Sequence, residues 1–173
     1  LVGMVLIDLR KAFDTVDGEI LIDKLSAMGV KSLDWFRSYL LNREQCTQVD
    51  GVNSSFQQVT CGVPQGSILG PTLFLCYVND MSCALKCHLS LYADDSALIC
   101  SGRSASAIAS FLSEQLSLCR KWLVDNRLSL HVGKTESILF GSRRRINTAG
   151  EFLVKCDGEL VQRVTSTVYI GVK

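Results

Sequence analysis

Two adjacent aspartates interrupt an apolar stretch of this chain, HLSLYADDSALIC at residues 88–100. The aliphatic residues on both sides predict that the segment is buried. An ionised carboxylate that leaves water costs several kcal/mol of free energy unless a cation or a polar partner compensates it. The segment must therefore fold so that Asp94 and Asp95 meet a cation or a partner.

Strand geometry restricts how the two side chains can do so. Neighbouring strand residues point to opposite faces of a sheet, whereas the tip of a tight hairpin lets both side chains reach one sheet edge. We therefore expect a hairpin over residues 88–100. Alternation puts Asp94 on the face of Ser90 and Tyr92, so we expect Asp94 to point inward as a ligand and Asp95 to flank it.

A third carboxylate has a similar setting in GMVLIDLRKAFD, residues 3–14. Asp8 ends a predicted strand and shares a face with Met4 and Leu6. Asp8 and Asp94 on adjacent strands would repel each other unless cations lay between them. Mg²⁺ fits, because it binds one or two carboxylates together with waters and substrate phosphates. The alternative is that these aspartates are helix caps or turn residues.

Length, charge and cysteine count limit the class of protein to which the chain can belong. The chain has 173 residues, 47% of them hydrophobic, which is enough for one domain with a core. Its net charge of +1 is not typical of nucleic-acid-binding proteins. No apolar run approaches the roughly 20 residues of a membrane span, so no membrane contact is expected. Eight cysteines without a CxxC pair predict buried free thiols, with zinc ligation and disulfides as the alternatives.

Hydrophobic periodicity, capping residues and turn signals predict the order of the elements. Helices are expected at residues 17–29, 32–43, 72–81 and 104–126, and strands at residues 2–9, 128–130, 136–141, 152–155, 159–164 and 167–172. A second hairpin is expected around Asp50-Gly51, and a glycine- and proline-rich loop at residues 62–71. This mixture predicts an α+β fold, with an antiparallel sheet and helices packed on one face. Both ends fall within strand-like runs, so we expect a fragment of a longer protein.

Three blocks in a fixed order resemble the palm motifs of reverse transcriptases. They are LIDLRKAFDTVD (6–17), GVPQGSILGPTLF (62–74) and YADD (92–95), with weaker matches in LSLHVGKTE (128–136) and VYIGV (168–172). The glycine loop and the alanine of YADD are most similar to enzymes of non-LTR (LINE-type) retrotransposons. The resemblance covers residues 1–173 and implies a palm domain with a ferredoxin- or RRM-like core.

The resemblance implies roles for the matching residues. Asp8, Asp94 and Asp95 would hold two Mg²⁺ ions, which Mn²⁺ can replace. Lys134 would be a catalytic lysine acting on the leaving pyrophosphate. Residues at the metal or the incoming nucleotide would be Leu9, through its carbonyl, Lys11, Ala12, Phe13, Gln65 and Gly66, and residues at the primer or template would be Gly62, Pro64, Tyr92, Tyr169 and Gly171. For Phe13, Gln65 and Lys134 the alternatives are a core aromatic, a turn residue and a solvated surface lysine.

The implied activity is that of an RNA-directed DNA polymerase, which transfers a nucleotide from a dNTP to a primer 3′-hydroxyl. Two metal ions about 3.5–4 Å apart would stabilise the attacking and the leaving oxygen. The implied partners are an RNA template, a DNA primer, the dNTP, and the rest of the parent polypeptide with its fingers, thumb and endonuclease domain. Without fingers and thumb, we expect the fragment alone to be inactive. The family's life cycle implies a cytoplasmic and nuclear location.

Some features depart from the family pattern or stay open. Gly18 replaces the usual histidine and His131 the usual asparagine, but neither position carries metal. The SRRR segment at 142–145 is a candidate contact for a nucleic-acid backbone or a solvated loop. The alternative functions are a non-enzymatic relative that binds RNA or acts as a scaffold, and a palm-fold nucleotide cyclase, which would have no use for the GVPQGS loop.

Overall fold

The computed structural model describes residues 1–170, and the chain divides into two compact units. The first unit combines residues 1–10 with the chain from Asp80 onward, and the second unit is Lys11–Asn79. The assignment of all 173 residues to one palm domain stays a prediction. Each unit is described below by itself.

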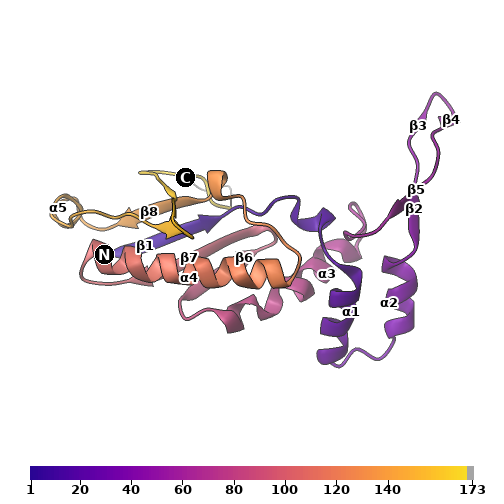
Figure 1. Cartoon of the computed structure of the whole chain (residues 1–173), viewed down its shortest axis with the longest axis horizontal. Helices are drawn as coiled ribbons and strands as arrows, with labels where there is room; N and C mark the ends of the chain where they lie inside the picture. Colours follow the sequence, from indigo (N-terminus) through magenta and orange to yellow (C-terminus); the bar gives the residue numbers. More distant parts are fainter. Residues whose placement is uncertain (171–173) are drawn as a thin grey trace. The chain divides into compact units, whose positions relative to one another are not determined.

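A five-stranded sheet forms the centre of the first unit (Figure 1). Its strands are β1 (Val2–Ile7), β6 (His88–Tyr92), β7 (Asp95–Ser101), β8 (Glu136–Phe140) and β11 (Gln162–Arg163), in the spatial order β11-β8-β1-β7-β6. All neighbouring pairs are antiparallel except β11 and β8, which are parallel. The predicted α+β fold and the predicted hairpin over residues 88–100 are thus confirmed.

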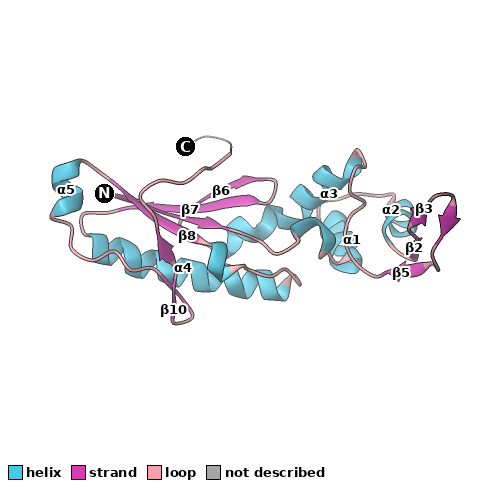
Figure 2. Cartoon of the chain, turned by 90° about the horizontal axis from the view of Figure 1, so that it is seen from above, coloured by secondary structure: helices cyan, strands magenta, loops and turns pink. Residues whose placement is uncertain are grey.

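One long helix, α4 (Ala105–Asp125), covers one face of this sheet (Figures 1 and 2). Its N-terminus is capped by Ser104, whose hydroxyl accepts from the Ala107 amide at 3.4 Å. The strand residues that face α4 include Val5 and Leu98, both fully buried. Gly3 lets the helix approach closely, because a Cβ at this position would lie 2.9 Å from Leu112 Cδ1. The opposite face of β1, which carries Leu6 and Asp8, is only half-buried.

The C-terminal part of the first unit contains less strand than expected. The predicted strand at 128–130 forms only one bridge, between Leu9 and Leu130. It fails to continue because the short helix η3 (Val132–Lys134) follows, with the Lys134 amide donating back to the His131 carbonyl. Past β8 the chain forms α5 (Arg143–Asn147), then the hairpin of β9 (Lys155–Cys156) and β10 (Glu159–Leu160). The predicted strand at 152–155 shrinks to β9, and the one at 159–164 divides into β10 and β11. Of residues 167–170, only Tyr169 forms a β-bridge, and residues 171 and 172 lie outside the described part.

In the second unit, the capping prediction is confirmed for the first helix but not for the second, which Ser32 precedes without a side-chain capping hydrogen bond. Asp17 caps α1 (Gly18–Ala27) by accepting from the amides of Glu19 and Ile20, both at 3.0 Å. Gly29 follows this helix with φ +87°, as expected of a C-terminal stop. The helix α2 (Leu33–Leu40) ends before the predicted residue 43, because Leu41 is extended.

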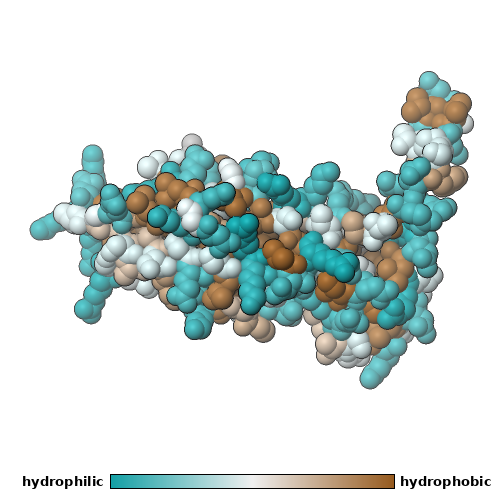
Figure 3. Space-filling model, in the orientation of Figure 1, coloured by the Kyte–Doolittle hydropathy of each residue, from teal (hydrophilic) through white to brown (hydrophobic). Residues whose placement is uncertain are grey.

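A long hairpin and a third helix complete the second unit. The inner strands β2 (Arg43–Gln45) and β5 (Gln57–Val59) pair with each other, and β3 (Gln48–Val49) pairs with β4 (Val52–Asn53) around the predicted Asp50-Gly51 turn. Val49 and Val52 make the hairpin tip apolar and exposed (Figure 3). The helix α3 (Leu69–Val78) begins earlier than predicted, and the 3₁₀ helix η2 (Asn79–Ala84) follows it.

The cysteines are less buried than predicted. All eight are free thiols, but only Cys119 and Cys156 are buried, whereas Cys61 and Cys83 are exposed. The prediction of buried thiols is therefore wrong for most of them, because several lie on strand or helix faces that the core does not cover.

Within residues 1–170, no helix is both long and apolar enough to cross a membrane.

Candidate functional site

The register of β1 and β7 brings Asp8 next to Asp95. Leu6 is paired with Ala97 and Ile7 with Ser96, which is the last pair of this ladder, so Asp8 and Asp95 adjoin its end. Both residues line one small cavity there. Asp8 is held in this place because its carbonyl accepts from the His131 amide at 2.8 Å. Two acids from distant parts of the sequence therefore lie at one sheet edge, although the expected pair was Asp8 with Asp94.

The hairpin turn places Asp94 differently from the expectation. Tyr92 is paired with Asp95, so Ala93 and Asp94 alone form the turn. Ala93 has φ +52°, a conformation that the first central residue of a tight hairpin turn adopts. The two-residue turn interrupts strand alternation, so Asp95 rather than Asp94 shares the face of Tyr92. The prediction that Asp94 shares this face is wrong, and Asp94 is exposed at the tip.

A small cavity of about 120 Å³ lies over this edge of the sheet. Asp8, Asp95 and Lys134 line it together with Glu136. Sequence reasoning missed Glu136, which reaches the site because β8 pairs it with Leu6, on the face of Asp8. The only sequence signal was its position two residues after Lys134, in the weaker LSLHVGKTE block.

The segment that contains Tyr169 also lies on this face. Thr167 donates its hydroxyl to Glu136 Oε2 at 2.6 Å, and Tyr169 donates its hydroxyl to Ser90 Oγ at 3.1 Å. These two contacts tie the segment to β8 and β6. Gly171, predicted to act with Tyr169, lies outside the described residues.

The oxygen atoms at this edge fit a hard divalent cation. Asp8 and Asp95 supply carboxylates, whereas Leu9, whose carbonyl was expected to take part, is not among the residues that line the cavity. Across residues 1–170, no three His, Cys, Asp or Glu side chains converge as a complete metal-binding group. A bound cation would therefore take further ligands from water or substrate, as Mg²⁺ commonly does.

In the second unit, backbone hydrogen bonds attach the glycine loop to residues 13–16. The Gly62 amide donates to the Val16 carbonyl at 2.7 Å, and the Val63 amide donates to the Phe13 carbonyl at 2.9 Å. Gly62 has φ +88°, and a Cβ there would lie 2.9 Å from the Asp14 carbonyl oxygen. Only glycine allows this approach.

The predicted nucleotide residues near this loop have distinct surroundings. Phe13 packs its ring on Phe74 of α3, with ring centres 4.5 Å apart, and stays half-buried. Lys11 is exposed in a left-handed conformation, and it precedes the short helix η1 (Ala12–Asp14), in which Ala12 is buried. Phe13 thus supports the core and keeps part of its ring accessible.

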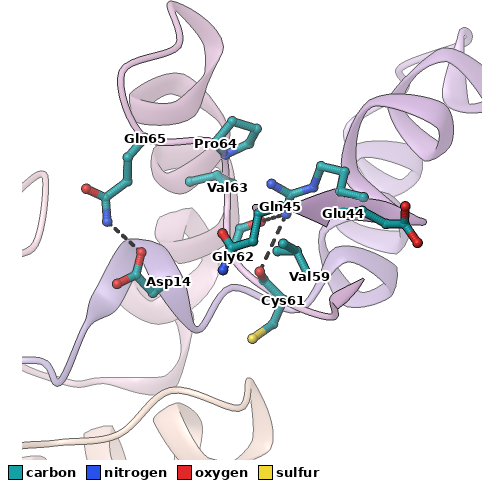
Figure 4. A pocket seen from close by; sticks show the side chains of 10 residues that line it. Asp14, Glu44, Gln45, Val59, Cys61, Gly62, Val63, Pro64 and Gln65 are labelled. Atoms are coloured by element: carbon teal, nitrogen blue, oxygen red, sulfur yellow. Dashed lines mark hydrogen bonds between the residues drawn. The ribbon is translucent and has the colours of Figure 1, made fainter. Parts of the chain in front are cut away.

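A cavity of about 650 Å³ lies beside the glycine loop and belongs entirely to the second unit (Figure 4). Its lining residues are Asp14, Arg43, Glu44, Gln45, Val59, Cys61, Gly62, Val63, Pro64 and Gln65. Arg43 is half-buried and donates to the carbonyls of Leu40, Cys61 and Gly62. Gly66 has φ +77° and open space around it. The predicted residues Gly62, Pro64 and Gln65 therefore surround one cavity.

Comparisons with known proteins show the family of the chain. The family described as "Reverse transcriptase (RNA-dependent DNA polymerase)" matches residues 2–173. The "RNA-directed DNA polymerase from mobile element jockey" of Drosophila melanogaster is 29% identical, over 96% of this chain and 19% of that protein. The "Probable RNA-directed DNA polymerase from transposon BS" of the same species is 26% identical, over 97% of this chain and 19% of that protein. This chain spans about a fifth of the length of these curated relatives.

A solved structure supports the same fold. An apo telomerase from Candida tropicalis, truncated from its C-terminal domain, superposes with a TM-score of 0.63 at 16% identity, over 82% of this chain and 31% of that chain. An α+β sheet whose edge gathers acids from separate segments defines a polymerase palm-like class of protein. Within that class, the chain belongs to the reverse transcriptase family. Its similarity to the mobile-element polymerases confirms the predicted resemblance to the non-LTR retrotransposon type.

Proposed function

We propose that the chain is the part of an RNA-directed DNA polymerase that carries its catalytic acids, and that the parent polypeptide serves a retrotransposon. The observation that carries the proposal is that Asp8 and Asp95 line one small cavity at a sheet edge, in a chain of this family. The reaction is the transfer of a nucleotide from a dNTP to a primer 3′-hydroxyl on an RNA template.

Divalent metal ions, Mg²⁺ or Mn²⁺, would be held by Asp8, Asp94, Asp95 and the Leu9 carbonyl. Such ions stabilise negative charge on the attacking and leaving oxygens. The residues of the chain supply positioning. The β1–β7 ladder ends at Ile7 and Ser96, so that Asp8 and Asp95 adjoin its end, and the two-residue turn keeps Asp94 beside Asp95. Lys134 lines the same cavity, where its ammonium can neutralise or protonate a leaving phosphate.

The second unit would supply contacts to nucleotide and nucleic acid. Phe13 presents a partly accessible ring, which suits contact with the sugar of the incoming nucleotide. The tight turn at Gly62 leaves the loop backbone beside a cavity, where a nucleic-acid strand can approach closely. Gln65 adds a side chain that can donate and accept hydrogen bonds. The proposed partners are an RNA template, a DNA primer and a dNTP.

The decisive experiment substitutes the acids in the polypeptide that carries this chain. Asp8→Asn and Asp95→Asn should each lower Mg²⁺-dependent primer extension on RNA by a factor of about 10²–10³ or more, because each removes an anionic ligand of the proposed metal ions, which stabilise charge in the transition state. Steady-state extension assays measure this. Asp23→Asn, an exposed acid on α1, is the matched control and should leave extension unchanged. Full activity of Asp8→Asn would show that the sheet edge is not the catalytic centre.

The same assay separates an enzyme from a non-enzymatic relative. A scaffold or RNA-binding relic of this fold would bind RNA without any metal-dependent extension. We expect extension from the full polypeptide and none from residues 1–173 alone, since this chain spans about a fifth of the related polymerases.

A further inference from the structure

One side-chain contact beside the glycine loop has no role in the assignments above. The Gln65 side-chain nitrogen donates to Asp14 Oδ1 at 2.5 Å (Figure 4). The two residues are 51 positions apart in the sequence, and both side chains are exposed at the cavity of about 650 Å³. The contact thus links the first palm-like block to the second.

The chemistry of this contact fixes which way the Gln65 amide faces. An ionised carboxylate can only accept hydrogen bonds, whereas an amide carries two N–H donors at one end and an acceptor oxygen at the other. The amide nitrogen of Gln65 must therefore face Asp14, and its Oε1 must face away. A glutamine without such a partner would present either end to a ligand.

The backbone around the pair limits its movement. The hydrogen bonds from Gly62 to Val16 and from Val63 to Phe13 hold the loop beside Asp14, and Arg43 holds the Gly62 carbonyl from the other side. Because loop and carboxylate are fixed in relation to each other, the hydrogen bond needs little further ordering of the chain.

We infer that Asp14 is a positioning residue, which orients Gln65 so that its Oε1 accepts a hydrogen bond from a sugar hydroxyl or base N–H of the nucleotide substrate. This inference rests on the proposed polymerase function. Asp14 itself need not touch the substrate. Its effect on activity must then pass through Gln65 alone.

A double-mutant cycle in the full polypeptide tests the inference. Asp14→Leu, which keeps the shape but accepts no hydrogen bond, should raise the KM for dNTP about 10-fold with kcat little changed, the effect of losing a substrate contact that is also made in the ground state. Asp14→Asn, which keeps an acceptor oxygen but lets the Gln65 amide turn either way, should have a smaller effect. In a Gln65→Leu background, Asp14→Leu should add no further change.

A direct readout separates the geometry from the activity. In the 173-residue chain, the NMR signals of the Gln65 side-chain NH₂ group should shift, and its solvent exchange should accelerate, in Asp14→Leu but not in the control Asp23→Leu. The inference is overturned if the Gln65 signals do not change in Asp14→Leu. It is also overturned if the effects of Asp14→Leu and Gln65→Leu on KM multiply in the double variant. If the signals respond while the unaltered polypeptide lacks extension activity, the contact stands, but the polymerase function and the substrate role inferred for it fail together.

Discussion

At the scale of single residues, the acids of the candidate site show what the sequence could and could not predict. The acids of the candidate site were readable from the sequence motifs, but the expected burial of Asp94 and Asp95 was wrong, because both are exposed. The exact placement of the acids was not readable either. A turn of two residues, Ala93 and Asp94, moved the face-sharing role from Asp94 to Asp95, and sequence alternation does not report turn length. Glu136 was missed because only the pairing of β8 with β1 brings it to Asp8.

Gly3 gives a residue-scale prediction about stability. Gly3 is buried where β1 packs against α4, and a side chain at this position would meet Ile108, Leu112 and Phe152. Gly3→Val should lower the free energy of unfolding by about 1–3 kcal/mol, because a close-packed core has to shift to accept the added atoms. Urea unfolding followed by circular dichroism measures the change.

The matched control for Gly3 is Gly133→Ala. A Cβ at Gly133 would meet only the His131 ring, at an ordinary 3.6 Å. This variant should unfold within about 0.5 kcal/mol of the parent chain. Equal stability of Gly3→Val and the parent would show that α4 does not pack as tightly on β1 as described.

At the scale of elements, local signals predicted helices better than short strands. Asp17, Ser104 and Gly29 mark helix ends through contacts within a few residues, so the sequence contains the necessary information. The strand predicted at 128–130 depended on pairing with distant residues, and η3 ended that pairing after one bridge. The glycine loop is likewise set by distant partners, above all by Arg43.

Arg43 gives the element-scale prediction. Its planar guanidinium donates to backbone carbonyls on both sides of the loop entrance, those of Leu40 and Gly62. A lysine ammonium has no such fork of donors. Arg43→Lys should therefore loosen the loop and speed hydrogen exchange of the Gly62 and Val63 amides about 10-fold or more. Hydrogen–deuterium exchange detects this.

Arg37→Lys serves as the comparison for Arg43→Lys. Arg37 pairs at 2.9 Å with Glu19, and both side chains are largely exposed. Such surface pairs contribute at most about 1 kcal/mol, so exchange at Gly62 should not change. An exchange rate at Gly62 that is the same in Arg43→Lys and the parent would contradict the anchoring role.

For the whole molecule, composition described the balance of charge but not where the thiols lie. The cysteine count suggested a set of buried thiols, and the fold buries two of eight. Burial raises the pKa of Cys119 to about 12 from an ordinary 9.0, with smaller contributions from the neighbouring Cys87 and Cys156. Burial also raises the pKa of Cys156. These shifts couple the stability of the whole fold to alkaline pH.

The sign of this coupling gives the last prediction. Above pH 9 the unfolded chain loses the Cys119 proton, whereas the folded chain keeps it up to about pH 12. The folded state then binds more protons, so the free energy of unfolding falls as the pH rises, by roughly 1.4 kcal/mol per pH unit for this thiol. Urea unfolding between pH 8 and 10 measures the slope. Cys119→Ala should flatten it, and an unchanged slope would contradict the burial argument.

By itself, the sequence determined the family, the α+β class, the capped starts of α1 and α4 and the acids of the two main motifs, because motifs, periodicity and caps are local patterns of residue types. Only the tertiary structure decided that Asp8, Asp95 and Glu136 line one cavity and that Asp14 holds Gln65. The physical reason is that strand register and loop contacts depend on hydrogen bonds between residues far apart in the chain, and no local pattern specifies which distant partner each group will find.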